Sequence, residues 1–314
     1  PGDRVGIAAL SGAIDPVRLA NGIDELSRLG FIPVPARNLG SRTGLFAGGE
    51  AERVAAFHEL ADDPEIGAIV FARGGHGLLP VLPLLDWARL AAVPRAYVGY
   101  SDLTPFLLNV IERLGWVAFH GPMVAADMAR GLSGEEESSL LSALAGDVQR
   151  ELELTVVDRG DGEARGLLLG GCLSLLASVA GTPFATPLGD ALLFLEDIDE
   201  PLYRIDRMLT QLDLSGSLTA IRAMILSASI VSPFDADALA HRVIARLQAG
   251  TCWINDPLTD NEAGPFGGMK KPGHSRELGV EGLDEFRETK HVHLDWKQEV
   301  KPYWYPYEKY NKLR

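Results

Sequence analysis

The sequence predicts an α/β protein with a parallel sheet, a second and smaller αβ domain, and a C-terminal αβ segment of foreign origin. First, short apolar runs alternate with helix-like stretches over the first half of the chain. Second, this alternation resumes on a smaller scale after a polar, acidic stretch from Ser133 to Glu163. Third, all seven lysines lie at or after Lys270, whereas 19 of the 22 arginines lie before it. A single domain rarely changes its cation so completely.

Five apolar runs predict the strands of the first domain: RVGIAAL (4–10), FIPVPA (31–36), AIVFA (68–72), AYVGY (96–100) and WVAF (116–119). Helical patterns separate them, among them EAERVAAFHELA (50–61) and DLTPFLLNVIERLG (102–115). Strands that alternate with helices are typical of βαβ units, whose parallel sheet is covered on both faces. We expect His58, on the first of these helices, to lie on the surface.

Three further runs predict the strands of the second domain: LLLGG (167–171), ALLFLED (191–197) and AIRAMIL (220–226). The pattern changes again at Leu226, where a strand, a helix closed by Gly250 and another strand follow. We therefore divide the chain into residues 1–150, 151–225 and 226–314.

Composition excludes several classes of function. The net charge of −14 argues against nucleic-acid binding, which needs cationic surfaces. No apolar run approaches the ~18 residues that span a bilayer, and Pro1 follows no export leader, so we expect a cytoplasmic protein without membrane contact. The two cysteines, Cys172 and Cys252, form no disulfide framework or metal motif.

The segment GYSD (99–102) is the strongest candidate for chemistry. It follows a predicted strand and opens a predicted helix, which places Ser101 at the carboxyl end of the sheet. Unpaired N–H groups at such a helix start can stabilise an oxyanion. The alternative is that Ser101 only caps the helix, since the usual G-x-S-x-G elbow is absent.

Several motifs occur in an order that resembles the LD-carboxypeptidases and their relatives that cleave microcin-type peptide adducts. The motifs are ARGGHG (72–77), GYSDLT (99–104), AFHGPM (118–123), GGCLSLLASVAGTPF (170–184) and LLFLEDIDEPLYRIDRMLTQL (192–212). The resemblance covers about residues 1–225 and implies a flavodoxin-like first domain. Two positions depart from the family pattern: His76 stands where Tyr is common, and Cys172 stands where Asn is common.

The resemblance also implies roles for four residues. Ser101 is the nucleophile, and Glu196 orients the catalytic histidine. Gly75 and Asp102 offer their backbone N–H groups to the oxyanion. A different interpretation of Glu196 is that it belongs to a solvated ion-pair network within EDIDEPLYRIDR (196–207).

The family's general base lies in a C-terminal Gly-His segment that this chain lacks. From Leu226 the sequence instead resembles the C-terminal end of aldehyde dehydrogenases, nearest the betaine-aldehyde group, through LSASIVSPFDADALAHRVIARLQAGTCWINDP, NEAGPFGGMKKPGHSRELGVEGLDEFRETKHV and EVKPYWYPY. The catalytic cysteine and dinucleotide domain of that family lie upstream of the matched region, so Cys252 is interpreted as a core residue. Among seven histidines, His274 superficially matches the Gly-His pattern and is the candidate base.

Taken together, the resemblance implies a serine peptidase that removes the terminal D-amino acid from a murein tetrapeptide without metal or nucleotide. We expect loss of the histidine segment to impair this activity. Hydrolysis of a peptide-nucleotide antibiotic is one alternative. A catalytically dead fusion, whose tail serves folding or assembly, is another, and an oxidoreductase activity of the tail alone is disfavoured. The expected partners are a muropeptide or peptide substrate and a second copy of the chain in a homodimer.

Overall fold

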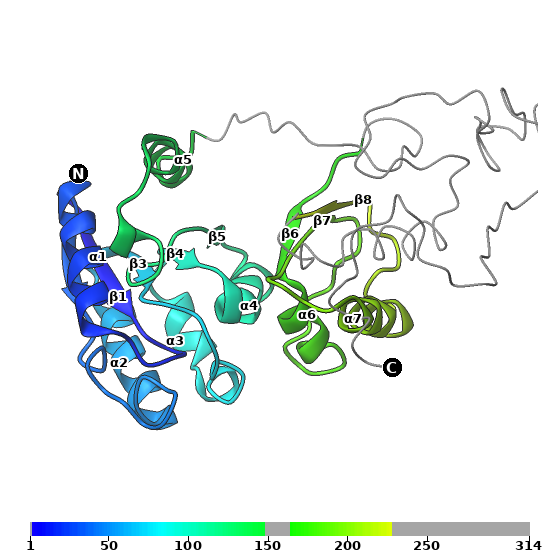
Figure 1. Ribbon diagram of the computed structural model, residues 1–314, viewed down its shortest axis with the longest axis horizontal. Coiled ribbons are helices and arrows are strands. Elements are labelled where there is room, and N and C mark those ends of the chain that lie inside the picture. Colours follow the sequence, from blue (N-terminus) through cyan, green and yellow to red (C-terminus); the bar gives the residue numbers. More distant parts are fainter. Residues whose placement is uncertain (1, 148–163, 228–314) are drawn as a thin grey trace, which may run out of the picture. The chain divides into compact units, whose positions relative to one another are not determined.

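Parallel strand pairing organises the structure, a computed structural model that describes residues 2–147 and 164–227. Five strands form the first sheet in the order β2-β1-β3-β4-β5 (Figure 1). They are β1 (Arg4–Ala8), β2 (Ile32–Pro35), β3 (Ile66–Phe71), β4 (Ala96–Gly99) and β5 (Phe119–His120). All four neighbouring pairs are parallel. This is the flavodoxin-like strand order, so the predicted fold class is confirmed.

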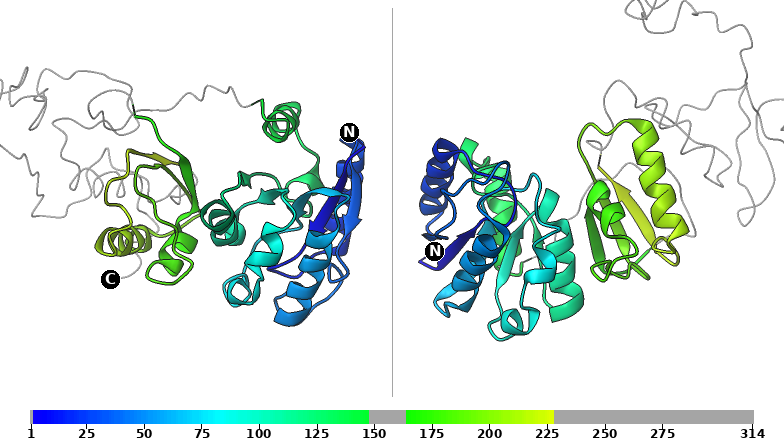
Figure 2. Two further views of the ribbon diagram at one scale, coloured as in Figure 1. Left: turned by 180° about the vertical axis from the view of Figure 1, so that it is seen from behind. Right: turned by 90° about the horizontal axis from the view of Figure 1, so that it is seen from below.

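Helices follow the strands of this sheet along the chain. They are α1 (Pro16–Arg28), α2 (Glu50–Asp62), α3 (Trp87–Ala91), α4 (Thr104–Leu114) and α5 (Gly134–Leu144). Helices α2, α3 and α4 pack next to one another, whereas α1 packs against a 3-10 turn at Met128–Arg130 (Figure 2). Among the described residues, no helix combines the length and apolarity needed to cross a bilayer.

Local signals explain where two of these helices begin. The Asp15 side chain accepts hydrogen bonds from the N–H groups of Val17 and Arg18, which would otherwise lack partners at the start of α1. Ser133 and Glu136 form a capping box at the start of α5. The start of the acidic stretch, predicted from the sequence to be a domain boundary, forms α5, which the sequence pattern did not predict.

An aromatic cluster forms the centre of the core beneath the sheet. Phe57, Phe71, Tyr97 and Phe106 are buried, and the rings of Phe71 and Phe106 meet edge to face at 5.3 Å between centroids. Such pairs add to the stabilisation from apolar burial.

The predicted surface position of His58 is wrong. Its side chain is 3% exposed, and its Nε2 accepts the backbone N–H of Asp86 at 3.1 Å. The short helix α3 begins directly after Asp86 and covers this part of α2. Burial lowers the pKa of the His58 imidazole, which therefore stays neutral at pH 7.

Three parallel strands form the second sheet in the order β6-β7-β8: β6 (Leu168–Cys172), β7 (Leu192–Glu196) and β8 (Ala223–Leu226). Helix α6 (Leu173–Val179) follows β6, and α7 (Leu202–Leu214) follows β7. Leu108 of α4 belongs to the same apolar cluster as residues of β6, β7 and both helices. The predicted boundary near residue 150 and nearly all of the predicted tail lie outside the described residues, so both stay predictions.

Candidate active site

Ser101 stands at the turn between β4 and α4. Its φ is 61°, in the left-handed region that residues other than glycine seldom adopt. A 3-10 turn, Ser101–Leu103, leads from the strand into the helix. The N-cap residue of α4 is Leu103, so helix capping does not account for a serine at position 101. A strained serine between a strand and a helix is the arrangement that exposes the nucleophile in α/β-hydrolases.

The glycine-rich loop after β3 lies directly against this turn. A Cβ atom on Gly74 would stand 3.0 Å from the Cβ of Ser101 and 3.2 Å from the backbone nitrogen of Asp102. Gly75 has a φ of 103°, which is unfavourable for any residue with a side chain. The loop therefore needs glycine at both positions, for close approach at Gly74 and for backbone conformation at Gly75.

Two buried charged residues hold this loop in place. The Asp102 carboxylate accepts the backbone N–H of Leu78 at 3.0 Å. The Arg53 guanidinium, on α2, donates to the carbonyls of Leu10 and Gly77, the latter at 2.7 Å. Arg53 is only 2% exposed, and its burial lowers the pKa of the guanidinium. This role of Arg53 was not predicted from the sequence, because its acceptors are carbonyls of distant residues.

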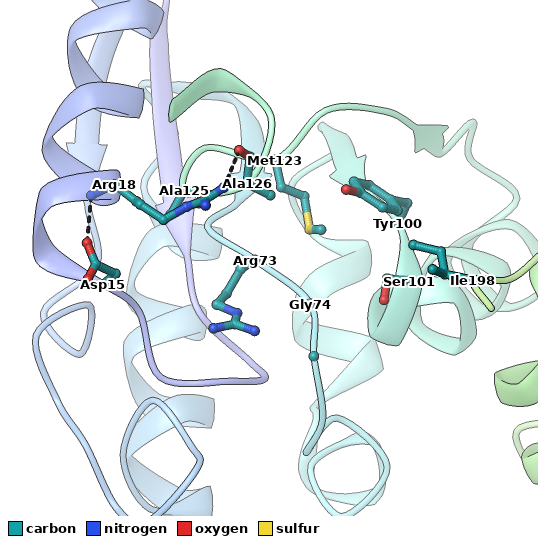
Figure 3. A pocket seen from close by; sticks show the side chains of 11 residues that line it. Asp15, Arg18, Arg73, Gly74, Tyr100, Ser101, Met123, Ala125, Ala126 and Ile198 are labelled. Carbon is teal, nitrogen blue, oxygen red and sulfur yellow. Dashed lines mark hydrogen bonds between the residues drawn. The ribbon is translucent and has the colours of Figure 1, made fainter. Parts of the chain in front are cut away.

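Ser101 and the glycine loop line one pocket, whose volume is about 410 Å³ (Figure 3). Five chain segments contribute to its lining, through Asp15, Arg18, Arg73, Gly74, Gly75, Tyr100, Ser101, Met123, Ala125, Ala126 and Ile198. Ligand sites of doubly wound sheets lie at this carboxyl edge of the strands.

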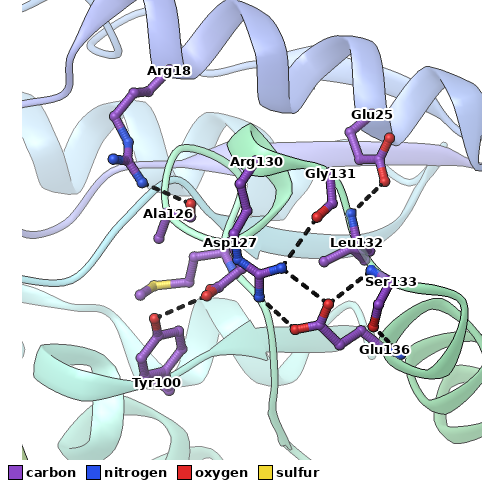
Figure 4. Close-up of polar contacts among 11 residues, drawn as sticks. Arg18, Glu25, Tyr100, Ala126, Asp127, Arg130, Gly131, Leu132, Ser133 and Glu136 are labelled. Atoms are coloured by element: carbon purple, nitrogen blue, oxygen red, sulfur yellow. Dashed lines mark hydrogen bonds and ion pairs between the residues drawn. The ribbon is translucent and has the colours of Figure 1, made fainter.

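The loop after β5 forms one wall of the pocket and is fixed by polar contacts (Figure 4). Arg18 donates to the carbonyls of Ala125 and Ala126, both at 2.8 Å. Asp127 accepts the N–H of Met123 at 3.1 Å. Further along the loop, the carboxylate of Glu25 accepts the N–H of Leu132 at 2.8 Å. These bonds join the loop to α1 and give the wall a defined position.

Tyr100 connects this wall to the nucleophile turn. Its hydroxyl lies 3.4 Å from a carboxylate oxygen of Asp127. Burial, followed by the charge of Asp127, raises the pKa of Tyr100 to about 12, and the charge of Glu196 contributes to the same shift. The hydroxyl therefore remains protonated at neutral pH. The Glu196 carboxylate thus acts electrostatically on a residue adjacent to Ser101.

Glu196 is the last residue of β7 and lies beside Cys172 in the sheet register. Burial raises the pKa of its carboxyl to about 7, and the charge of Asp197 adds to the shift. Its buried Oε1 has no hydrogen-bond partner among the described residues. A half-buried carboxylate with a free acceptor is suited to hold an imidazole N–H.

The two neighbouring carboxylates, those of Asp197 and Glu200, already have partners within the protein. Asp197 accepts the backbone N–H groups of Ser174 at 2.9 Å and of Ile198 at 3.0 Å. Glu200 forms an ion pair with Arg204 at 3.1 Å, although its alignment falls short of a hydrogen bond. An ion-pair network in this segment therefore exists, but it includes Glu200 and not Glu196 among the described residues.

The candidate base, His274, belongs to the segment 228–314 and therefore lies outside the described residues. The described histidines are His58, His76 and His120, and none has a hydrogen bond to Ser101 among the contacts of residues 2–147 and 164–227. The His120 ring lies 5.6 Å from the Tyr100 ring and 5.4 Å from the Phe194 ring between centroids.

The structure thus brings Ser101 and Gly75 into one pocket, with Asp102 beside them, whereas Glu196 is not among the residues that line it. Three further pocket residues were not predicted from the sequence: Arg18, Arg73 and Tyr100. The signal for Arg73 was its place immediately before Gly74 and Gly75, which leave room for a large side chain.

Comparison with known proteins identifies the family of the chain. The LD-carboxypeptidase N-terminal domain matches residues 5–121, and the LD-carboxypeptidase C-terminal domain matches residues 165–250. A probable murein peptide carboxypeptidase of Bacillus subtilis is 37% identical over 225 residues, which cover 69% of each protein. The murein tetrapeptide carboxypeptidase of Pseudomonas aeruginosa is 36% identical over 219 residues, 67% of this chain and 71% of the relative.

A solved structure shows the same architecture. The crystal structure of muramoyltetrapeptide carboxypeptidase from Oxalobacter formigenes superposes with a TM-score of 0.65 at 31% identity, over 78% of this chain and 85% of the other. The aldehyde dehydrogenase family matches residues 223–292, so it overlaps the preceding domain match over residues 223–250. By sequence, by fold and by the arrangement around Ser101, the chain belongs to the LD-carboxypeptidase family.

Proposed function

We propose that the protein is a serine-type LD-carboxypeptidase that removes the terminal D-amino acid from a murein tetrapeptide. The observation that carries this proposal is the strained Ser101 in one pocket with the glycine loop. The murein peptides named for the relatives supply the substrate class.

In the proposed reaction, Ser101 Oγ attacks the carbonyl carbon of the scissile amide while its proton passes to a general base. The N–H groups of Gly75 and Asp102 stabilise the oxyanion that forms. The C–N bond then breaks, and the base returns the proton to the departing amine. Water hydrolyses the ester on Ser101 by the same steps and releases the shortened peptide.

Glu196 has the role of orienting the base, because its Oε1 is a free acceptor within the described residues. His274 is the candidate base. We propose that turnover is weak, because the segment carrying the family's histidine is replaced by one similar to aldehyde dehydrogenases. Cleavage of a peptide-nucleotide adduct would use the same residues.

A fluorophosphonate probe and two substrates test the proposal. The full-length protein should be labelled at Ser101 and should release D-alanine from an L,D-tetrapeptide in preference to cleaving a peptidyl nucleotide. Ser101→Ala should lose both labelling and turnover, whereas Ser142→Ala, on the distant helix α5, should retain both. Labelling of the Ser101→Ala protein at another residue would refute the assignment.

A further inference from the structure

Arg73 is the arginine of the pocket whose guanidinium is only partly used in hydrogen bonds within the protein. Its side chain is exposed and lines the pocket, and Nη1 donates to the Ala13 carbonyl at 3.0 Å (Figure 3). Among the described residues, Nε and Nη2 have no acceptor and no carboxylate pairs with Arg73. The guanidinium therefore presents one free edge.

The second arginine of the pocket, Arg18, is held by hydrogen bonds to backbone carbonyls. Arg18 uses both Nε and Nη2 to hold the carbonyls of Ala125 and Ala126. The only carboxylate that lines the pocket, within the described residues, is Asp15, whose Oδ1 accepts two N–H groups at the start of α1. Neither residue competes with an incoming anion for Arg73.

Two glycines, Gly12 and Gly75, leave room for the Arg73 guanidinium because they carry no side chain. A Cβ atom on Gly75 would stand 3.1 Å from Nη2, and a Cβ atom on Gly12 would stand 3.3 Å from Nε. The same loop places Gly74 against Ser101, with 3.1 Å between its Cβ position and the serine Oγ. The guanidinium edge and the nucleophile thus flank two consecutive glycines.

A substrate cleaved at its last peptide bond carries a free carboxylate close to the bond that is broken. A terminal carboxylate is separated from the scissile carbonyl carbon by one nitrogen and one Cα, or about 4 Å. A guanidinium edge binds a carboxylate through two parallel hydrogen bonds, a geometry that a lysine ammonium cannot reproduce.

We propose that Arg73 binds the free C-terminal carboxylate of the leaving amino acid and thereby restricts the enzyme to the end of a peptide. This assignment rests on the proposed peptidase function and adds the residue that makes it a carboxypeptidase. An amidated or extended peptide would leave Arg73 unpaired and would place a neutral group beside it.

Equilibrium binding separates this idea from catalysis. The full-length Ser101→Ala protein is titrated by calorimetry with an L,D-peptide that ends in a free D-alanine carboxylate, and with the C-terminal amide of the same peptide. The free acid should bind about 10- to 100-fold more tightly than the amide, which is the range for a hydrogen bond to a charged group.

Substitution of Arg73 should remove this preference. In the Ser101→Ala background, Arg73→Gln should bind acid and amide alike, and Arg73→Lys should keep part of the preference through its charge. Arg37→Gln is the control, because Arg37 forms a surface ion pair with Glu59 at 3.1 Å and lies outside the pocket. Circular dichroism checks the fold of each variant.

Each outcome bears on one hypothesis. Equal binding of acid and amide by the Ser101→Ala protein, absence of binding of the acid, or a preference that survives in Arg73→Gln would overturn the role of Arg73. A different result would separate the two hypotheses. If Arg73→Gln abolishes the preference for the acid over the amide, but the wild-type protein is neither labelled at Ser101 nor active, then the carboxylate site is supported and the proposed reaction is refuted.

Discussion

The Asp102 carboxylate accepts the backbone N–H of Leu78 at 3.0 Å and so ties the nucleophile turn to the far end of the glycine loop. Both partners are buried: Asp102 is 2% exposed and Leu78 is fully buried. The position of the proposed oxyanion donors relative to Ser101 thus depends on this side chain as well as on the backbone.

Replacement of Asp102 by alanine should lower both stability and reactivity. The buried N–H of Leu78 would lose its acceptor, which costs about 1–3 kcal/mol. Chemical denaturation and the rate of fluorophosphonate labelling measure the two effects. Asp102→Asn retains an oxygen acceptor and should fall between alanine and the wild type. A labelling rate unchanged in Asp102→Ala would show that the bond does not position the site.

Gly74→Ala should slow labelling of Ser101 at least tenfold. The added methyl group would stand 3.0 Å from the Ser101 Cβ and 3.2 Å from the Asp102 nitrogen, so the loop or the nucleophile must shift. A displacement of only about 1 Å at a reacting centre can lower the reaction rate about 100-fold. Gly40→Ala is the matched control, since a Cβ at that position meets nothing within 4 Å. Equal labelling rates for the two variants would contradict the steric argument.

Glu196 should make stability depend on pH. Burial raises the pKa of its carboxyl from 4.5 to about 7, so the folded state binds the proton more tightly than the unfolded state. The resulting stabilisation is fully present below pH 4.5 and is lost as pH rises to about 7, with a magnitude of the order of 3 kcal/mol. Denaturation curves between pH 4.5 and 8 should show this fall in the wild type.

Glu196→Gln carries no titrating proton and should lack this component. Glu59→Gln, a change of an exposed residue on α2, should keep it. An identical pH dependence in wild type and Glu196→Gln would show that the carboxyl ionises normally.

Turnover of an L,D-tetrapeptide should be far below the ~10 per second typical of enzymes. A base must lie within about 3 Å of the nucleophile, and a segment from another family has no reason to meet that requirement. Steady-state release of D-alanine measures this directly. Turnover near 10 per second would sink the idea, and loss of that turnover in His274→Ala, but not in His120→Ala, would identify the tail as the source of the base.

The strands could be predicted closely because each apolar run overlaps one parallel strand. AIVFA (68–72) falls on β3 and AYVGY (96–100) on β4. The helix α5 could not be foreseen, because its first turn is Glu135, Glu136 and Glu137 and its apolar side is short. Its capping box, however, was visible in the sequence.

Only part of the site could be predicted, because the local sequence pattern marks some of its residues and not others. Ser101 and Glu196 each end an apolar run, so local pattern exposes them. Arg53 and Arg18 act through carbonyls 24 to 108 positions away, and no local pattern contains that information. The predicted surface position of His58 was wrong because the spacing of apolar residues along α2 does not reveal that α3 covers this histidine.

The bonds from Arg18 to Ala125 and Ala126 also govern the order in which the pocket can be completed during synthesis. One wall requires a residue near the start of the chain and carbonyls 107 and 108 positions later. Synthesis proceeds at about 5–20 residues per second, so several seconds separate the emergence of the two partners from the ribosome. The nascent chain therefore displays its nucleophile turn before it has a closed binding wall, and substrate affinity should appear as a late event of biogenesis.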